Sequence, residues 1–181
     1  MNENILSAPQ LSRRGLLKVG LLGTAFLATA GVTATLSGCS ASIPASGLAT
    51  LRVSDLPFLR ALIPVVIAGS VSPEKMAAAV EQSIVGIDYS LTRFSPEMQK
   101  LTVQLFDVLA LGLTRGPLTG VWGSWENASA EDVRNFLSRW QNSSIGLLKM
   151  GHAAILQLVM LAWYGQPESW AHCGYPGPPT V

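Results

Sequence analysis

Three segments of the chain carry signals that start an α-helix, and these signals constrain the fold more than any other feature. Each begins with a serine followed by proline or acidic residues: Ser72-Pro73-Glu74, Ser95-Pro96-Glu97 and Ser129-Ala130-Glu131-Asp132. A serine oxygen at this position accepts hydrogen bonds from the free amides of the first turn, and nearby acidic groups favour the positive end of the helix dipole. We therefore expect a helix to begin at each serine.

Apolar residues after each serine recur at intervals of three and four, the spacing of one face of a helix. After Ser72 and Ser95 the two sets are Met76, Val80, Ile84, Ile87 and Leu91, then Met98, Leu101, Leu105, Val108, Leu109 and Leu113. A third helix is expected at residues 130–140, with a stripe of Val133, Phe136, Leu137 and Trp140. No segment alternates between apolar and polar residues for long enough to predict a sheet.

Two further helices complete the prediction. The first covers residues 55–68 and is kinked or ended near Pro64. The last covers residues 144–164 and is apolar nearly all round, so we expect it to be the central buried helix, ended by Gly165. A loop is expected around Gly112, Gly116 and Gly120, and a short turn from Pro167 to Trp170. The predicted fold is all-α, a single small domain of about five helices in a bundle-like or orthogonal packing.

The N-terminal part of the chain has the features of an export signal. Arg13 and Arg14 stand before an apolar segment at residues 19–36, in Ser12-Arg13-Arg14-Gly15-Leu16-Leu17-Lys18, which resembles the twin-arginine export signature. The segment ends in Leu36-Ser37-Gly38-Cys39, which resembles the lipobox of bacterial lipoproteins. We therefore expect residues 1–38 to be a cleaved twin-arginine lipoprotein signal peptide.

Cleavage would make Cys39 the acylated N-terminus, and several acyl chains hold a protein on a membrane far more firmly than one. The expected location is the periplasmic side of a bacterial membrane. Residues 39–50 are rich in small residues without a period and are expected to be a flexible tether to the domain at residues 51–181. The alternative is that residues 19–36 stay uncleaved as a transmembrane helix, because about 18 residues approach the thickness of a bilayer.

Charge and motif content argue against several classes of function. Removal of residues 1–38 takes away a net charge of +2 and turns the chain's +1 into −1, and the remaining cations are scattered, so no nucleic-acid partner is expected. The histidines, His152 and His172, stand in no metal-binding spacing, and no nucleotide-binding glycine motif is present. We expect no metal, no cofactor and no catalytic residue in this chain.

The remaining reactive side chains have ordinary structural explanations. His152 lies in an apolar helix, where a hydrogen-bonded core histidine is more common than a catalytic base, and Cys173 is expected to be a packed small hydrophobe. A hydrolase stays open only because a Ser-His-acid site need not be visible in a sequence. All five tryptophans, Trp122, Trp125, Trp140, Trp163 and Trp170, lie toward the C-terminus; two or three of them are expected in the core, and the rest are candidates for binding.

The C-terminal segment carries the most individual motif. It reads Trp163-Tyr164-Gly165-Gln166-Pro167-Glu168-Ser169-Trp170 and then Gly174-Tyr175-Pro176-Gly177-Pro178-Pro179. This ending, with Leu62-Ile63-Pro64 and the twin arginines, resembles the small, or third (gamma), subunit family of membrane-associated gluconate 2-dehydrogenase-type flavoprotein dehydrogenases. Only the tail motif is specific to that family. The candidate partner-binding residues are Trp163, Tyr164, Trp170, Tyr175, Pro176 and Pro178.

The resemblance implies a non-catalytic accessory subunit. Such a subunit accompanies a large FAD-dependent dehydrogenase of the glucose-methanol-choline type, assists its maturation and carries it through the twin-arginine translocase. The lipobox at Cys39 departs from many family members and adds an anchoring role. The alternative is a free-standing periplasmic lipoprotein that binds a small ligand or an envelope component, in which case the tail aromatics seal the domain's own helices.

Overall fold

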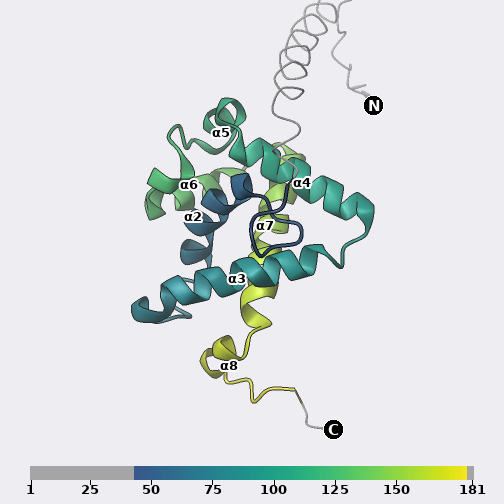
Figure 1. Ribbon diagram of the computed structural model, residues 1–181. Helices are drawn as coiled ribbons and strands as arrows, with labels where there is room; N and C mark the ends of the chain where they lie inside the picture. The colour runs from purple at the N-terminus through teal and green to yellow at the C-terminus, as the bar shows by residue number, and fades with distance from the viewer. Residues whose placement is uncertain (1–42, 179–181) are drawn as a thin grey trace, which may run out of the picture. The chain divides into compact units, whose positions relative to one another are not determined.

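The computed structural model describes residues 43–178, and this part of the chain is helical (Figure 1). Its α-helices are α2 (Leu56–Val66), α3 (Met76–Leu91), α4 (Pro96–Ala110), α5 (Gly112–Thr119), α6 (Ala130–Gln141), α7 (Gly146–Tyr164) and α8 (Pro167–Cys173). These residues contain no strand, only an isolated bridge between Pro44 and Arg52. The all-α prediction is confirmed. The signal peptide with Arg13 and Arg14, and the lipidation site Cys39, lie outside the described residues.

Two of the three predicted helix starts are confirmed in detail. The Ser95 hydroxyl accepts a hydrogen bond from the Met98 amide, and the Ser129 hydroxyl accepts one from the Asp132 amide at 3.1 Å. The Asp132 carboxylate in turn accepts from the Ser129 amide, so each group caps the other. It also accepts from the Ser129 hydroxyl at 2.7 Å, and this bond, followed by the one from the Ser129 amide, lowers the pKa of Asp132. Ser72 instead precedes a 3-10 turn, and α3 begins four residues later at Met76.

Residues 43–178 form two more α-helices than expected. The glycine-containing segment predicted to be a loop is α5, and the turn predicted after Pro167 extends into α8. In α5 the buried Gly116 faces the indole of Trp122, where a Cβ would lie 2.6 Å from the ring. The glycine therefore allows Trp122 to close over the helix, a tertiary contact that spacing alone did not reveal.

The core forms where α2, α3, α6 and α7 meet, with α2 at its centre. Phe58 of α2 contacts Phe106, Trp125 and Phe136, and Trp140 extends this aromatic cluster. Trp125, Trp140 and Trp163 are buried, as the sequence predicted for two or three tryptophans. The stripe predicted for α6 is confirmed.

The stripe predicted for α4 is confirmed only in part, because Leu109 is buried and Leu105 packs against the core. This helix buries Thr102, Phe106 and Leu109, whereas Met98 and Leu101 of the predicted set are exposed, and so is Leu113 beyond the end of α4. The reason is that Phe106 inserts into the aromatic cluster against Phe58, which turns the helix away from the face that apolar spacing favoured.

Residues 43–50, expected to belong to a flexible tether, are instead part of the folded domain. The carboxylate of Asp88 on α3 accepts hydrogen bonds from the amides of Ala49, Thr50 and Leu51, each at 2.8 Å. The segment also closes on itself, because the Ala45 amide donates to the Leu51 carbonyl. The tether prediction is therefore wrong from Ile43 onward, and residues 39–42 lie outside the described part.

Arg52 fastens the end of this segment to the helices. Its guanidinium binds Asp55 at 2.8 Å and Asp107 of α4 at 2.6 Å, and it is almost completely buried. The hydrogen bond to Asp55 is the main reason that the pKa of Arg52 lies above its ordinary value, with Asp107 adding to it. Contacts with both α3 and α4 therefore hold the first described residues in place.

Candidate partner-binding surface

Helix α7 has one buried face and one exposed apolar face. Ile155, Val159 and Trp163 lie in the core, where α7 packs against α3, α6 and α2. The opposite side, here called the open face of α7, consists of Leu147, Met150, Ala153, Ala154, Met160, Leu161 and Tyr164. Leu147 is 73% exposed and Met150 69%. The prediction of a central buried helix is therefore confirmed for one face of α7 and wrong for the other.

Only two polar side chains of α7 are exposed on this half of the helix, Lys149 and Gln157. They are eight residues apart, which places them about 80° from each other around the helix axis. Their positions were the signal that could have revealed which half of the helix faces solvent. The apolar residues around them are what sequence analysis assigned to the core.

Among the described helices, α7 is the one long and apolar enough to cross a membrane by length and composition. Its buried face packs against the rest of the domain, and only 28% of its most apolar stretch is buried.

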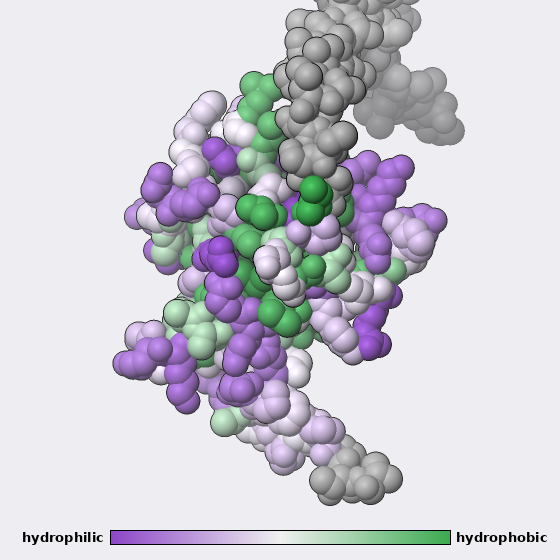
Figure 2. Space-filling model, viewed as in Figure 1, coloured by the Kyte–Doolittle hydropathy of each residue, from purple (hydrophilic) through white to green (hydrophobic). Residues whose placement is uncertain are grey.

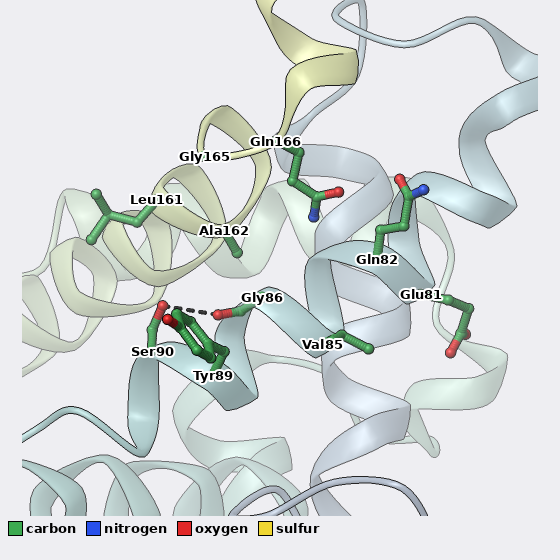
Figure 3. A pocket seen from close by; sticks show the side chains of 10 residues that line it. All are labelled: Glu81, Gln82, Val85, Gly86, Tyr89, Ser90, Leu161, Ala162, Gly165 and Gln166. Atoms are coloured by element: carbon green, nitrogen blue, oxygen red, sulfur yellow. Dashed lines mark hydrogen bonds between the residues drawn. The ribbon is translucent and has the colours of Figure 1, made fainter. Parts of the chain in front are cut away.

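An open cavity of about 710 Å³ lies between α3 and the end of α7 (Figure 3). Its lining residues are Glu81, Gln82, Val85, Gly86, Tyr89, Ser90, Leu161, Ala162, Gly165 and Gln166. Gly86 brings the two helices together, because a Cβ at this position would lie 3.1 Å from the Cβ of Ala162. The cavity is continuous with the open face of α7 through Leu161, which belongs to both.

Three of the polar side chains that line the cavity, Glu81, Tyr89 and Ser90, are engaged in structural contacts. Glu81 forms an ion pair with Arg60 of α2 at 2.8 Å, and this hydrogen bond is the main cause of its lowered pKa. Tyr89 holds the guanidinium of Arg93 over its ring, 4.3 Å from the ring centre. The Ser90 hydroxyl donates to the Gly86 carbonyl, shown dashed in Figure 3. The cavity therefore offers apolar side chains and the amides of Gln82 and Gln166 rather than a poised acid or base.

The tail aromatics form a small unit of their own, here called the tail cluster, made of Trp170 and Tyr175. The Trp170 and Tyr175 rings meet edge to face at 5.4 Å, and the Tyr175 amide donates to the Trp170 carbonyl. The Trp170 indole also donates to the Tyr164 carbonyl at 3.2 Å, which ties the cluster to α7. In Figure 1, α8 and the tail extend beyond the end of α7.

The structure separates the six candidate partner-binding residues into two groups. Trp163 is buried in the core, so its side chain is not available to a partner and this assignment is corrected. Tyr164, Tyr175, Pro176 and Pro178 are exposed, and Trp170 is half-buried. For these five a binding role stays a prediction.

We expect truncation before Gly174 to leave the melting temperature of the domain within about 2 °C of the full-length value. It removes Tyr175 from Trp170, but this contact lies in the terminal unit and not in the core, so its loss acts locally. Calorimetry of the truncated and full-length proteins is the measurement. A fall of several degrees would show instead that the tail seals the domain.

The remaining reactive side chains are dispersed. His152 is half-buried on α7, where burial lowers its pKa, and His172 is exposed on α8. Cys173 is exposed at the end of α8, so the expectation of a packed hydrophobe is wrong. Within residues 43–178, no group of three or more histidine, cysteine or acidic side chains is arranged to hold a metal ion.

The surface features therefore gather at one region: the open face of α7, the cavity beside α3 and, tied to the end of α7, the tail cluster. The resemblance to the accessory subunits rests on sequence motifs alone. Comparison of the chain with protein-family models, with curated proteins and with solved structures finds no match.

Proposed function

We propose that this protein is a non-catalytic accessory subunit that binds a folded FAD-dependent dehydrogenase of the glucose-methanol-choline type. It escorts this partner through the twin-arginine pathway and anchors it to the membrane by lipid on Cys39. The observation that carries the proposal is the open face of α7, a row of apolar side chains with no covering element among the described residues. Exposed apolar patches on small domains commonly mark sites of protein association.

The size of this face supports a protein partner. A helix of 19 residues is about 28 Å long, and apolar side chains are exposed from its first turn to its last. A surface of this length fits the apolar centre of a protein interface, with Lys149 and Gln157 as polar contacts beside it. The motif-bearing tail is tied to the end of the same helix, so one partner can contact both.

The alternative is a free-standing lipoprotein whose ligand occupies the cavity between α3 and α7. The cavity volume of about 710 Å³ is in the range of small-molecule sites. Such sites usually enclose most of the ligand, whereas this cavity is open to solvent. An open apolar depression suits a protruding side chain of a protein partner better.

The direct test is purification of the tagged protein from membranes, followed by a search for flavin in a co-purifying large chain. We expect the double substitution Met150→Glu and Leu161→Glu to abolish most of this co-purification. Both side chains are exposed, so the charges should leave the melting temperature within a few degrees while they make an apolar contact unfavourable.

The matched control places the same two charges on an exposed face elsewhere. Asn135→Glu and Ser138→Glu lie on the outer side of α6, and we expect this variant to recover the large chain in full. If both double variants recover it equally, the open face of α7 is not the interface. If the wild-type protein brings down no flavoprotein and the domain alone binds a small molecule, the alternative function is correct.

Anchoring is tested separately at Cys39. We expect Cys39→Ala to accumulate as uncleaved precursor that is not labelled by radioactive palmitate, because the thiol that accepts the acyl chain is absent. Labelling that persists in this variant would contradict the lipobox. Co-purification of the large chain with this unacylated variant would show that partner binding does not require the lipid.

A further inference from the structure

We propose that one end of the domain, the surface formed by Ile43, Val53, Leu111, Leu113 and Trp122, lies against the lipid surface to which Cys39 is attached. This inference rests on the acylation of Cys39 in the proposed function. All five side chains are apolar and exposed, and Trp122 is 77% exposed. They are here called the anchor-side patch.

The length of chain between Cys39 and the domain restricts how far the domain can move from the membrane. The described chain begins at Ile43, and only Ser40, Ala41 and Ser42 separate it from Cys39. Four residue steps span at most about 14 Å when fully extended. Acyl chains on Cys39 would place this residue at the interface, so the surface around Ile43 is held close to the headgroups.

Two residues of the patch stand beside each other at this point. The antiparallel bridge between Pro44 and Arg52 places Ile43 opposite Val53, because neighbours on either side of a bridged pair face each other. Ile43 is 63% exposed and Val53 is 69% exposed. The bridge is held in place by two contacts. The Asp88 carboxylate of α3 accepts a hydrogen bond from the Leu51 amide, and the buried Arg52 binds α4.

The other residues of the patch follow along α4 and α5. Arg52, next to Val53, binds Asp107, and Leu111 lies one helical turn beyond Asp107. Leu113 projects from the first turn of α5 and is 66% exposed, while Trp122 lies over Gly116 of the same helix. In Figure 1, α5 and α8 lie at opposite ends of the domain, and Figure 2 shows apolar residues (green) on the face near α2 and α4.

The composition of the patch fits a bilayer surface. Tryptophan is enriched at membrane interfaces because its ring is apolar and its N–H is polar. Isolated aliphatic side chains on either side of a tryptophan can enter the headgroup region without burying a charge. With α5 toward the membrane, α8 and the tail cluster are left on the opposite end of the domain, accessible to a protein partner.

The test measures contact of single positions with lipid in the anchored protein. Mature acylated protein carrying Cys173→Ser is reconstituted in phosphatidylcholine and phosphatidylglycerol vesicles, with a thiol-reactive fluorophore at Val53→Cys, Leu113→Cys or, as control, Glu168→Cys. A phosphatidylcholine bearing a nitroxide near its headgroup is the quencher. We expect loss of most of the emission at positions 53 and 113 and little loss at position 168, which lies on α8.

Each other outcome overturns the inference. Equal, weak quenching at all three positions in protein that remains on the vesicles would show an anchored domain held away from the bilayer, with the proposed function intact. Probes shielded from water but unquenched by lipid, in protein of doubled mass, would assign the patch to a second copy. Wild-type protein that fails to stay on vesicles would refute the anchor and this inference together.

Discussion

Replacing Asp88 with alanine is expected to lower the free energy of unfolding by about 3 kcal/mol and the melting temperature by about 10 °C. The carboxylate accepts three backbone hydrogen bonds from residues 49–51, and hydrogen bonds to a charged group are the stronger kind. The bond from the Leu51 amide is buried, so removal of its acceptor leaves a donor that water reaches poorly. Thermal unfolding followed by circular dichroism measures the effect.

Two further variants serve as comparisons for Asp88→Ala: one removes only the negative charge at position 88, and the other removes an exposed carboxylate on the same helix. Asp88→Asn keeps one acceptor oxygen, which can serve the Thr50 and Leu51 amides, but turns an NH₂ group toward the Ala49 amide, so we expect intermediate stability. Glu81→Ala removes an exposed carboxylate paired with Arg60 and is expected to cost no more than about 1 kcal/mol. If Asp88→Ala were as stable as Glu81→Ala, residues 43–50 would not depend on this carboxylate, contrary to the contacts described above.

Replacing both Arg13 and Arg14 with lysine is expected to leave the protein in the cytoplasm as full-length precursor, with no mature form detectable outside. Lysine keeps the positive charge of the segment but lacks the planar, five-donor guanidinium group. If export required only positive charge at these positions, the lysine variant would still be exported. A receptor that binds the guanidinium groups would not accept it. Pulse labelling and cell fractionation measure the ratio of precursor to mature protein.

A strain that lacks the twin-arginine translocase provides the control. The wild-type chain is expected to accumulate there as precursor, as the double lysine variant does in a normal strain. Normal processing of the wild-type chain in that strain would assign export to the general secretory pathway. The substitutions lie outside residues 43–178, so the stability of the purified domain should be the same in both proteins.

Local signals in the sequence were enough to determine the fold class and much of the helix layout. The caps at Ser95 and Ser129 depend on atoms within three residues of each other, and the stripe of α6 depends on helical spacing alone. Such features follow from short-range geometry, so they can be predicted without knowing what the helix packs against. The motifs at Arg13, Arg14 and Cys39 are local in the same way, and their prediction depends on the sequence alone.

Tertiary contacts decided which faces became surface and which became core. Spacing showed that α7 is apolar, but only its packing against α3, α6 and α2 left Leu147 and Met150 exposed. Residues 43–50 look like a linker by composition, yet Asp88, almost forty positions away, holds them in the domain. The pattern of residues along the chain shows how apolar a segment is. Which helix packs against each of its faces depends on the free energy of the whole packed arrangement. The candidate interface and the anchor-side patch both arise from that choice.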